Sequence, residues 1–169
     1  EYQGYVIPST NDPAKIHWLT SLLDANGISY GHAEGMSKGT GLDYADLRTK
    51  KVQVKPGDLI VDARQPQSSL LQVFMDPNPE LSDSLTYDIT TWALPYAYGL
   101  EAYAMTTPVP SASQELPVEP TPVLKGETPA YAYVLHYNTD LGTPVLAALL
   151  KAGATLRVVK RPIEANGAT

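Results

Sequence analysis

Aromatic and acidic side chains concentrate between Ser84 and Met105, a stretch that holds five Tyr and Trp residues and two acids. These residues are Tyr87, Asp88, Trp92, Tyr96, Tyr98, Glu101 and Tyr103. A tyrosine ring is apolar whereas its hydroxyl needs a hydrogen-bonding partner, so the stretch fits two arrangements. One is a platform for a ligand, and the other is a packed layer whose hydroxyls bond to the backbone. We favour the packed layer.

Helical spacing divides these side chains into two groups. Trp92, Tyr96 and Leu100 recur every four residues, which places them on one face of a helix. We expect this face to be buried. Tyr98 and Glu101 then point elsewhere, and we predict that they contact a ligand or partner.

Histidine could supply a metal site or a further ligand contact. The three histidines are His17, His32 and His136, and none lies in an H-x-x-E or H-E-x-x-H pattern. His32 stands two residues before Glu34, a spacing that could share a metal only from a loop. His136 follows a strand-like run, and open α/β sheets bind ligands beyond such strand ends. We therefore add His136 to the ligand-binding candidates, and expect no catalytic residue, metal or cofactor in this chain.

Composition argues against several classes of function. The chain has no cysteine, which excludes disulfides, thiolate metal sites and a cysteine nucleophile. It has no G-x-S-x-G elbow and no glycine-rich phosphate loop, and no spacing pairs two acids for general acid–base catalysis. A net charge of −6 argues against binding to nucleic acid. No apolar run reaches the ~18 residues of a membrane span.

Strand–helix–strand patterns occupy both ends of the chain. The first covers residues 2–33, where Pro13 stands early in the predicted helix and Gly27 ends it. The second covers residues 130–164. Between them we predict a surface loop at 35–51, a strand or hairpin at 52–63, a helix that ends before Pro77, and a Pro-rich linker or excursion at 106–129.

The two terminal patterns are similar to each other. With a one-residue gap, Leu19, Leu22, Leu23, Ala25 and Gly27 align with Leu146, Leu149, Leu150, Ala152 and Gly153. This similarity fits an internal repeat, or convergent patterning, since any buried helix face carries this spacing. Strand–helix–strand units favour parallel pairing. We therefore predict a single α/β domain over residues 1–169, with an open, mostly parallel sheet flanked by helices, and expect the six leucines to be buried.

Longer segments carry a family resemblance. They are YVIPSTNDPAKIHWLTSLLDANGI, PGDLIVDARQPQSSLLQVFMDPNPELSDSLTYDITTWALPYAYGLEAY and AYVLHYNTDLGTPVLAALLKAGATLRVV. Together they resemble the region that follows the catalytic domain in multidomain bacterial zinc carboxypeptidases of the carboxypeptidase A-like type. The most specific part is YDITTWALPYAYGLEAY after QPQSSLLQVFMDP.

The resemblance implies an accessory domain, similar in fold to class I glutamine amidotransferases, cut from a periplasmic, cell-surface or secreted metallopeptidase. The family holds its zinc through an H-x-x-E pair and a later His in the preceding domain, so no catalytic residue carries over to this chain. The amidotransferase nucleophile is a cysteine, which is absent. The expected partners are the peptidase domain of the same polypeptide and a peptide substrate, with no nucleic acid and no membrane span.

Two other functions stay open. The chain could be a stand-alone module that binds a small ligand or glycan in an aromatic pocket lined by Tyr96, Tyr98 and His136. It could also be a degenerate hydrolase that uses an unrecognised Asp or Ser.

Overall fold

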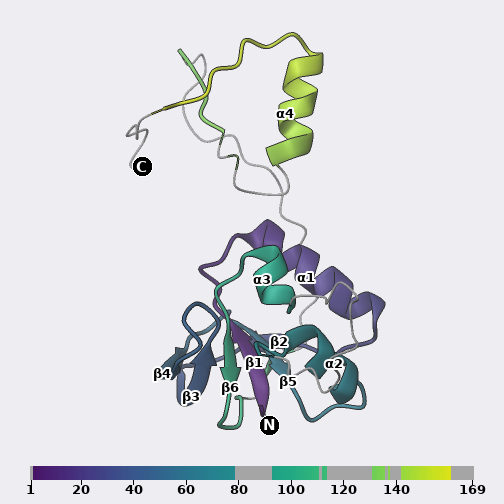
Figure 1. Cartoon of the computed structure of the whole chain (residues 1–169), viewed down its shortest axis with the longest axis vertical. Coiled ribbons are helices and arrows are strands. Elements are labelled where there is room, and N and C mark those ends of the chain that lie inside the picture. The colour runs from purple at the N-terminus through teal and green to yellow at the C-terminus, as the bar shows by residue number, and fades with distance from the viewer. Residues whose placement is uncertain are drawn as a thin grey trace, which may run out of the picture. The chain divides into compact units, whose positions relative to one another are not determined.

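A computed structural model describes residues 2–78, 93–110, 112–113, 131–135, 137 and 142–160 (Figure 1). The chain forms two compact units, Glu1–Glu119 and Pro120–Thr169, and their boundary falls inside the Pro-rich stretch at 106–129. Every strand among the described residues belongs to the first unit, and the described helix of the second unit is α4 (Gly142–Lys151). No helix in the described ranges is long and apolar enough to cross a membrane.

The first unit is built on a seven-stranded sheet in the order β4-β3-β6-β1-β5-β2-β7. The strands are β1 (Gly4–Ile7), β2 (Gly31–Ala33), β3 (Ser37–Asp43), β4 (Thr49–Val54), β5 (Leu59–Asp62), β6 (Tyr103–Met105) and β7 (Ala112–Ser113). Each neighbouring pair is antiparallel. The predicted open, mostly parallel, amidotransferase-like sheet is therefore wrong.

The error has a topological cause. The predicted strand–helix–strand unit exists, and β1 and β2 run in the same direction because both pair antiparallel with β5. They are not neighbours, however, because β5 arrives later in the chain and lies between them. The predicted loop at 35–51 is also wrong, since β3 and β4 form a hairpin there.

The helices of the first unit are α1 (Pro13–Ala25), α2 (Ser68–Met75) and α3 (Leu94–Tyr98). Helix α1 begins as its sequence predicts, because the Asp12 carboxylate accepts a hydrogen bond of 2.9 Å from the Ala14 N–H, beside Pro13. Gly27, at φ 65°, follows its end. Helix α2 ends before Pro77, as predicted.

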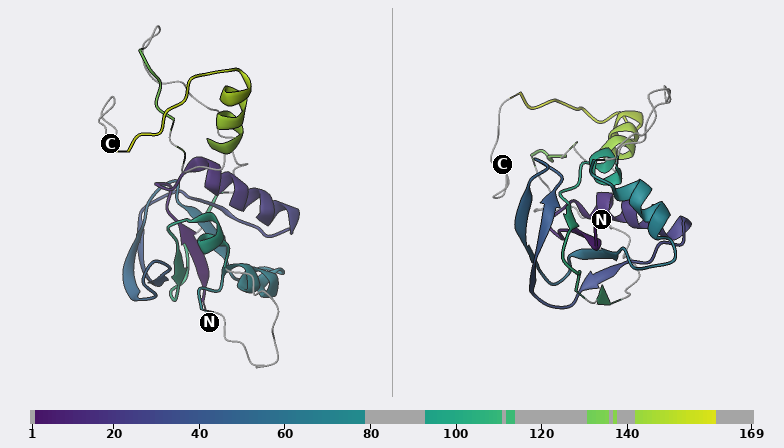
Figure 2. Two further views of the ribbon diagram at one scale, coloured as in Figure 1. Left: turned by 45° about the horizontal axis from the view of Figure 1, so that its top comes forward. Right: turned by 60° about the horizontal axis from the view of Figure 1, so that its bottom comes forward.

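The two faces of the sheet have separate cores. The three helices cover one face, where Tyr5 and Ile7 of β1 pack with Leu19 and Leu23 of α1. Val6, between those two strand residues, points to the opposite face because successive side chains of a strand alternate. That opposite core contains Val6, Val52, Val54, Ile60 and Met105. The β3–β4 hairpin lies on this side, away from the helices (Figure 2).

The sheet must curl strongly to bring β4 over this second core. Only residues 55–58 join β4 to β5, although three strands separate them in the sheet. In a flat sheet the four strand-to-strand spacings from β4 to β5 would add up to ~19 Å. The two ends of a tight turn, in contrast, lie within ~7 Å of each other. The Asp58 N–H donates to the Lys55 carbonyl at 3.1 Å, and Gly57 has φ 86°, so the link is a tight turn. The sheet is therefore a partly open barrel.

Within the described part of the aromatic stretch, Tyr96 has a structural role. The ring of Tyr96 packs edge-on against the ring of Tyr44, with 5.2 Å between the two ring centroids. The Tyr96 hydroxyl donates a hydrogen bond of 3.2 Å to the Pro77 carbonyl. Leu100 is buried in the core on the helix side, as predicted, but it does not share a helical face with Tyr96, because α3 ends at Tyr98 and Gly99 takes a left-handed conformation. Trp92, the third residue of the predicted face, lies outside the described residues, as do Tyr87 and Asp88.

Candidate functional site

A cleft of about 250 Å³ opens at one end of the curled sheet of the first unit. Its walls come from three segments that are distant in sequence. The loop between β1 and α1 contributes Pro8 and Thr10, and β4 with its following turn contributes residues 51–53, Lys55 and Asp58. Glu101 and Tyr103, at the start of β6, complete the cleft.

A buried carboxylate ties the first two walls together. Asp58 is only 3% exposed, and its Oδ1 accepts hydrogen bonds from the Ser9 N–H at 2.9 Å and the Ser9 hydroxyl at 3.1 Å. Its Oδ2 accepts from the Lys55 N–H at 2.8 Å. Because both oxygens are occupied by the protein itself, Asp58 fixes the cleft rather than serving as its reactive group.

An amide side chain ties the first wall to the third. The Asn11 Nδ2 donates to the carbonyls of Pro8 and Glu101, each at 2.9 Å, and its Oδ1 accepts from the Glu101 N–H at 2.8 Å. This paired contact holds the backbone of Glu101 as a neighbouring strand would. Asp58 and Asn11 together make the cleft a preformed site.

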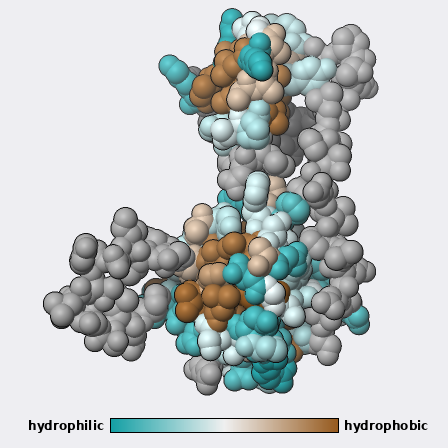
Figure 3. Space-filling model, turned by 90° about the vertical axis from the view of Figure 1, so that its right-hand side faces the viewer, coloured by the Kyte–Doolittle hydropathy of each residue, from teal (hydrophilic) through white to brown (hydrophobic). Residues whose placement is uncertain are grey.

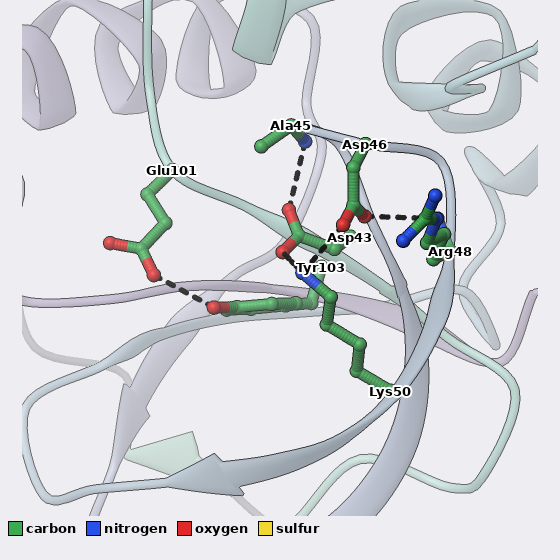
Figure 4. A network of polar contacts seen from close by, with 7 residues as sticks. All are labelled: Asp43, Ala45, Asp46, Arg48, Lys50, Glu101 and Tyr103. Carbon is green, nitrogen blue, oxygen red and sulfur yellow. Dashed lines mark hydrogen bonds and ion pairs between the residues drawn. The ribbon is translucent and has the colours of Figure 1, made fainter.

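The third wall presents a phenol and a carboxylate in contact. The Tyr103 hydroxyl donates to Glu101 Oε1 at 2.7 Å (Figure 4). Burial of the ring, and then this hydrogen bond, raise the pKa of Tyr103 to about 12. The phenol is therefore neutral near pH 7, and the second oxygen of Glu101 stays available as an acceptor on the exposed side.

The lysines on β4 and directly after it differ in their partners. Lys50 bridges Asp43 at 2.7 Å and Asp46 at 2.9 Å, and these contacts, Asp43 first, raise the pKa of its ammonium (Figure 4). Lys51 and Lys55 line the cleft and form no ion pair with any described residue. Their ammonium groups are exposed, so they can meet a negative charge brought by a ligand.

The predicted ligand-binding residues are not gathered in one site. Glu101 lines the cleft, whereas Tyr98 is half-buried against the core on the helix side and is not among the residues of the cleft. His136 lies outside the described residues. No three His, Asp or Glu side chains in the described ranges lie close enough together to hold a metal ion.

Sequence reasoning missed most of the cleft. Lys51 belongs to the RTKK run that charge patterning alone assigns to a solvated loop or strand end. Asp58 is one acid among several in the central third of the sequence, and Asn11 is one of several polar residues that precede the predicted helix. One available signal was the Pro56–Gly57 pair between two apolar runs, because it places the flanking Lys55 and Asp58 at a turn.

Comparisons of this chain with protein-family models, with curated proteins and with solved structures find no match. The function of the cleft must therefore be inferred from the chemical groups that line it. The cleft offers two lysines that no described residue pairs, a carboxylate acceptor, and the main chain of a sheet edge.

Proposed function

We propose that the first unit is an accessory domain of a zinc carboxypeptidase-like protein, and that it contacts peptide substrate through the cleft beside β4. The family resemblance of the sequence supports the peptidase context. The geometry of the cleft supports the peptide. The zinc chemistry would belong to the peptidase domain of the same polypeptide, on which this domain would dock or whose access it would shape.

The observation that carries the proposal is the way in which β4 lines the cleft. Three consecutive residues, 51–53, reach it. Successive side chains of a strand point to opposite faces, so consecutive residues share a cleft only along the strand's edge. Strand β4 is the end of the sheet order, and among the described residues it pairs with β3 alone. An extended peptide can add to such an edge through main-chain hydrogen bonds.

The charges of the cleft favour a peptide that bears carboxylates. Lys51 and Lys55 are four residues apart, which is roughly 13 Å along an extended chain, and neither is neutralised by a described residue. Glu101 on the opposite wall accepts hydrogen bonds and repels a second carboxylate. The negative groups of the peptide would therefore lie toward β4, with its amide donors toward Glu101.

Titration of the chain with an acidic hexapeptide, followed by NMR, tests the proposal. Chemical shifts should change at residues 51–55 and 101–103. Exposed ion pairs each contribute ~0.2–1 kcal/mol, so replacing Lys51 and Lys55 by Gln should weaken binding by about 2–30-fold. Arg64→Gln is the matched control, because Arg64 follows the far end of β5 and is paired with Asp62. Equal weakening by the control, or no shift changes at β4, contradicts peptide binding at this cleft.

The peptidase context needs its own test. In a polypeptide that joins this domain to a zinc carboxypeptidase domain, the double substitution of Lys51 and Lys55 by Gln should raise KM for acidic peptides and leave kcat nearly unchanged. This pattern is expected because the cleft would add binding without touching the reacting atoms. If the isolated domain binds the acidic peptide but the double substitution leaves KM unchanged in the two-domain polypeptide, the accessory role is refuted and peptide binding at the cleft is not.

The contact between Tyr103 and Glu101 favours a second candidate, a small-ligand or glycan-binding module. An aromatic ring beside a carboxylate acceptor suits a sugar, whose C–H face packs on the ring while its hydroxyls donate. The same titration with a neutral oligosaccharide separates the candidates. Shifts centred on Tyr103 that survive the loss of both lysines would favour the glycan.

A further inference from the structure

The direction of the main-chain groups along β4 follows from one hydrogen bond at the closed end of the β3–β4 hairpin. The Asp43 N–H donates to the Arg48 carbonyl at 3.0 Å, and the register of the hairpin places these two residues opposite each other. Hydrogen-bonded pairs of an antiparallel ladder recur at every second residue. The main-chain groups of Lys51 and Gln53 therefore point away from β3.

A second hydrogen bond, on the other side of β3, gives the same result. The Thr106 N–H donates to the Thr40 carbonyl at 2.9 Å, so the main chain of Thr40 is turned toward β6. Thr40 stands opposite Lys51 in the hairpin. Two opposite residues of an antiparallel pair turn either toward each other or away from each other. The N–H and carbonyl of Lys51 therefore face the outer edge of β4, where residues 51–53 line the cleft.

The turn after β4 limits how far a ligand can pair with this edge. The Lys55 N–H donates to Asp58 Oδ2 at 2.8 Å, and the Lys55 carbonyl accepts from the Asp58 N–H at 3.1 Å. Both main-chain groups of Lys55 are occupied, so Lys55 meets a ligand through its side chain. Thr49 also points away from β3 by the same count, but it does not line the cleft. Main-chain pairing within the cleft is thus confined to Lys51 and Gln53.

The side chains of β4 alternate between the two faces of the sheet. Val52 is 5% exposed in the core on the face away from the helices, whereas Lys51 and Gln53 are exposed on the other face. In a strand added beside β4, each side chain shares the face of the residue opposite it. A ligand residue opposite Val52 would therefore point toward this core, against which Tyr103 of the cleft packs.

Apolar surface occurs elsewhere in the chain. Leu150 of α4 is 59% exposed, so the prediction that all six leucines are buried is wrong. In the first unit, Figure 3 looks at the side that carries α2, away from β4, and apolar side chains gather there. The edge of β4 is flanked instead by the exposed side chains of Lys51, Gln53 and Lys55. Charge and main-chain hydrogen bonds therefore dominate recognition at this edge.

We propose that the cleft takes up its peptide as an added strand, antiparallel to β4, with acidic side chains at the first and fifth residues and a small apolar side chain at the fourth. This inference rests on the peptide binding proposed above. The first residue would lie opposite Lys55, the third opposite Gln53 and the fifth opposite Lys51. The third and fifth would each exchange a pair of main-chain hydrogen bonds with β4, while the fourth, opposite Val52, packs toward Tyr103.

The direction and the charge pattern have separate grounds. Every described pair of neighbouring strands in the sheet is antiparallel, and antiparallel pairing is slightly more stable per residue than parallel pairing. The two acids are four residues apart because Lys51 and Lys55 are. An acid at the fourth residue would instead place its charge against an apolar core, which is costly.

Methylation of the ligand's main-chain nitrogens tests the register, with the whole chain as the receptor. The probe is the capped peptide acetyl-Glu-Thr-Thr-Val-Glu-amide, and its Kd is measured from the amide chemical shifts of residues 51–53. A methyl group on the nitrogen of the third or fifth residue removes a donor to β4, and each should weaken binding about tenfold. The second and fourth nitrogens point to solvent, so a methyl group on either is the matched control and should change Kd less than about twofold.

The charge pattern is tested with a peptide of the same composition. Exchange of the last two residues, which gives acetyl-Glu-Thr-Thr-Glu-Val-amide, turns one acid toward the core and should weaken binding about tenfold. Equal binding of the two peptides would overturn the proposed pattern.

Two matched proline substitutions test the edge from the side of the protein. Gln53→Pro removes the outward N–H of Gln53 and should abolish binding, although an edge strand tolerates proline where the N–H has no neighbouring strand to bond. Thr49→Pro removes the same outward group beyond the cleft and should leave Kd within about twofold. Unchanged amide shifts of residues 39–43 show that each variant keeps the hairpin.

The outcomes distinguish this inference from the proposed function. If the peptide shifts residues 51–55 but tolerates a methyl group at the third and fifth nitrogens, peptide binding stands and the added strand is refuted. If methylation weakens binding at the second and fourth nitrogens instead, the strand is parallel and the proposed register is wrong. If no shifts change, peptide binding fails as well. A peptide-free dimer that pairs through residues 51–53 would also overturn the inference, because a second copy of the chain would then occupy the edge.

Discussion

Asp58 should be the most sensitive polar residue of the first unit, although it lies on the wall of an open cleft. Its carboxylate accepts three hydrogen bonds, from the Ser9 N–H, the Ser9 hydroxyl and the Lys55 N–H. Asp58→Ala removes all three and leaves two backbone donors to find water. Hydrogen bonds to charged groups contribute ~1.5–3 kcal/mol each. Because donors beside a cleft can be rehydrated, we expect a total loss of about 2–4 kcal/mol rather than the full sum.

Graded controls separate this contribution from a general effect of substitution. Ser9→Ala removes only the hydroxyl contact at 3.1 Å and should cost about 0.5–1.5 kcal/mol. Asp24→Asn changes an exposed carboxylate whose bonded partner is the Tyr30 hydroxyl, and its effect should stay within about 0.5 kcal/mol. The predicted order is therefore Asp58→Ala, then Ser9→Ala, then Asp24→Asn.

Urea unfolding followed by tryptophan fluorescence measures these losses. Both tryptophans, Trp18 and Trp92, belong to the first unit, so the signal reports that unit. The midpoint should fall with an unchanged m-value, and the melting temperature of Asp58→Ala should drop by roughly 8–16 °C, at ~4 °C per kcal/mol. A loss below about 1 kcal/mol, or one no larger than that of Ser9→Ala, would refute the role given to Asp58.

Three further changes probe the core, a close backbone approach and a phenol. Leu23→Ala should cost about 2–5 kcal/mol in chemical unfolding because Leu23 is fully buried, whereas Leu150→Ala should leave the unfolding of α4, followed by circular dichroism, almost unchanged. Gly4→Ala should lose about 1–3 kcal/mol, since its new Cβ would lie 2.8 Å from the Val61 carbonyl oxygen, while Gly35→Ala meets no atom within 4 Å and should be neutral or slightly stabilising. Folding raises the pKa of the Tyr103 phenol from 10.0 to about 12, so the unfolded chain loses this proton at a lower pH than the folded chain does. The free energy of unfolding therefore falls as pH rises from 10 to 12. Tyr103→Phe should show a smaller drop in melting temperature across that pH range.

Local signals in the sequence predicted both ends of α1 and the end of α2, although not the end of α3. Asp12, Pro13 and Gly27 delimit α1, and Pro77 follows α2, because caps and breakers act on the backbone within a few residues. The buried face of α1 was also predictable from the spacing of Leu19 and Leu23. These features depend on neighbours along the chain.

Strand pairing was decided by contacts that local sequence does not encode. The pattern of β1, α1 and β2 is the same whether the strands are adjacent or separated, and only the later β5 determines which arrangement forms. Likewise, Gly39 and Gly41 suggested a loop, whereas in β3 they permit the close approach of Met105, whose side chain would lie under 3.0 Å from a Cβ at either position.

The cleft was also a product of tertiary structure. Its residues come from the loop after β1, from β4 and its following turn, and from the start of β6, and these segments meet because the tight turn at 55–58 forces the sheet to curl. The sequence by itself determined the chemical groups that the chain offers, with neither cysteine nor a metal-binding motif, and it determined where α1 begins and ends. Folding decided which lysines line the same cleft as Glu101, because hydrogen bonds such as those of Asp58 join residues 49 positions apart.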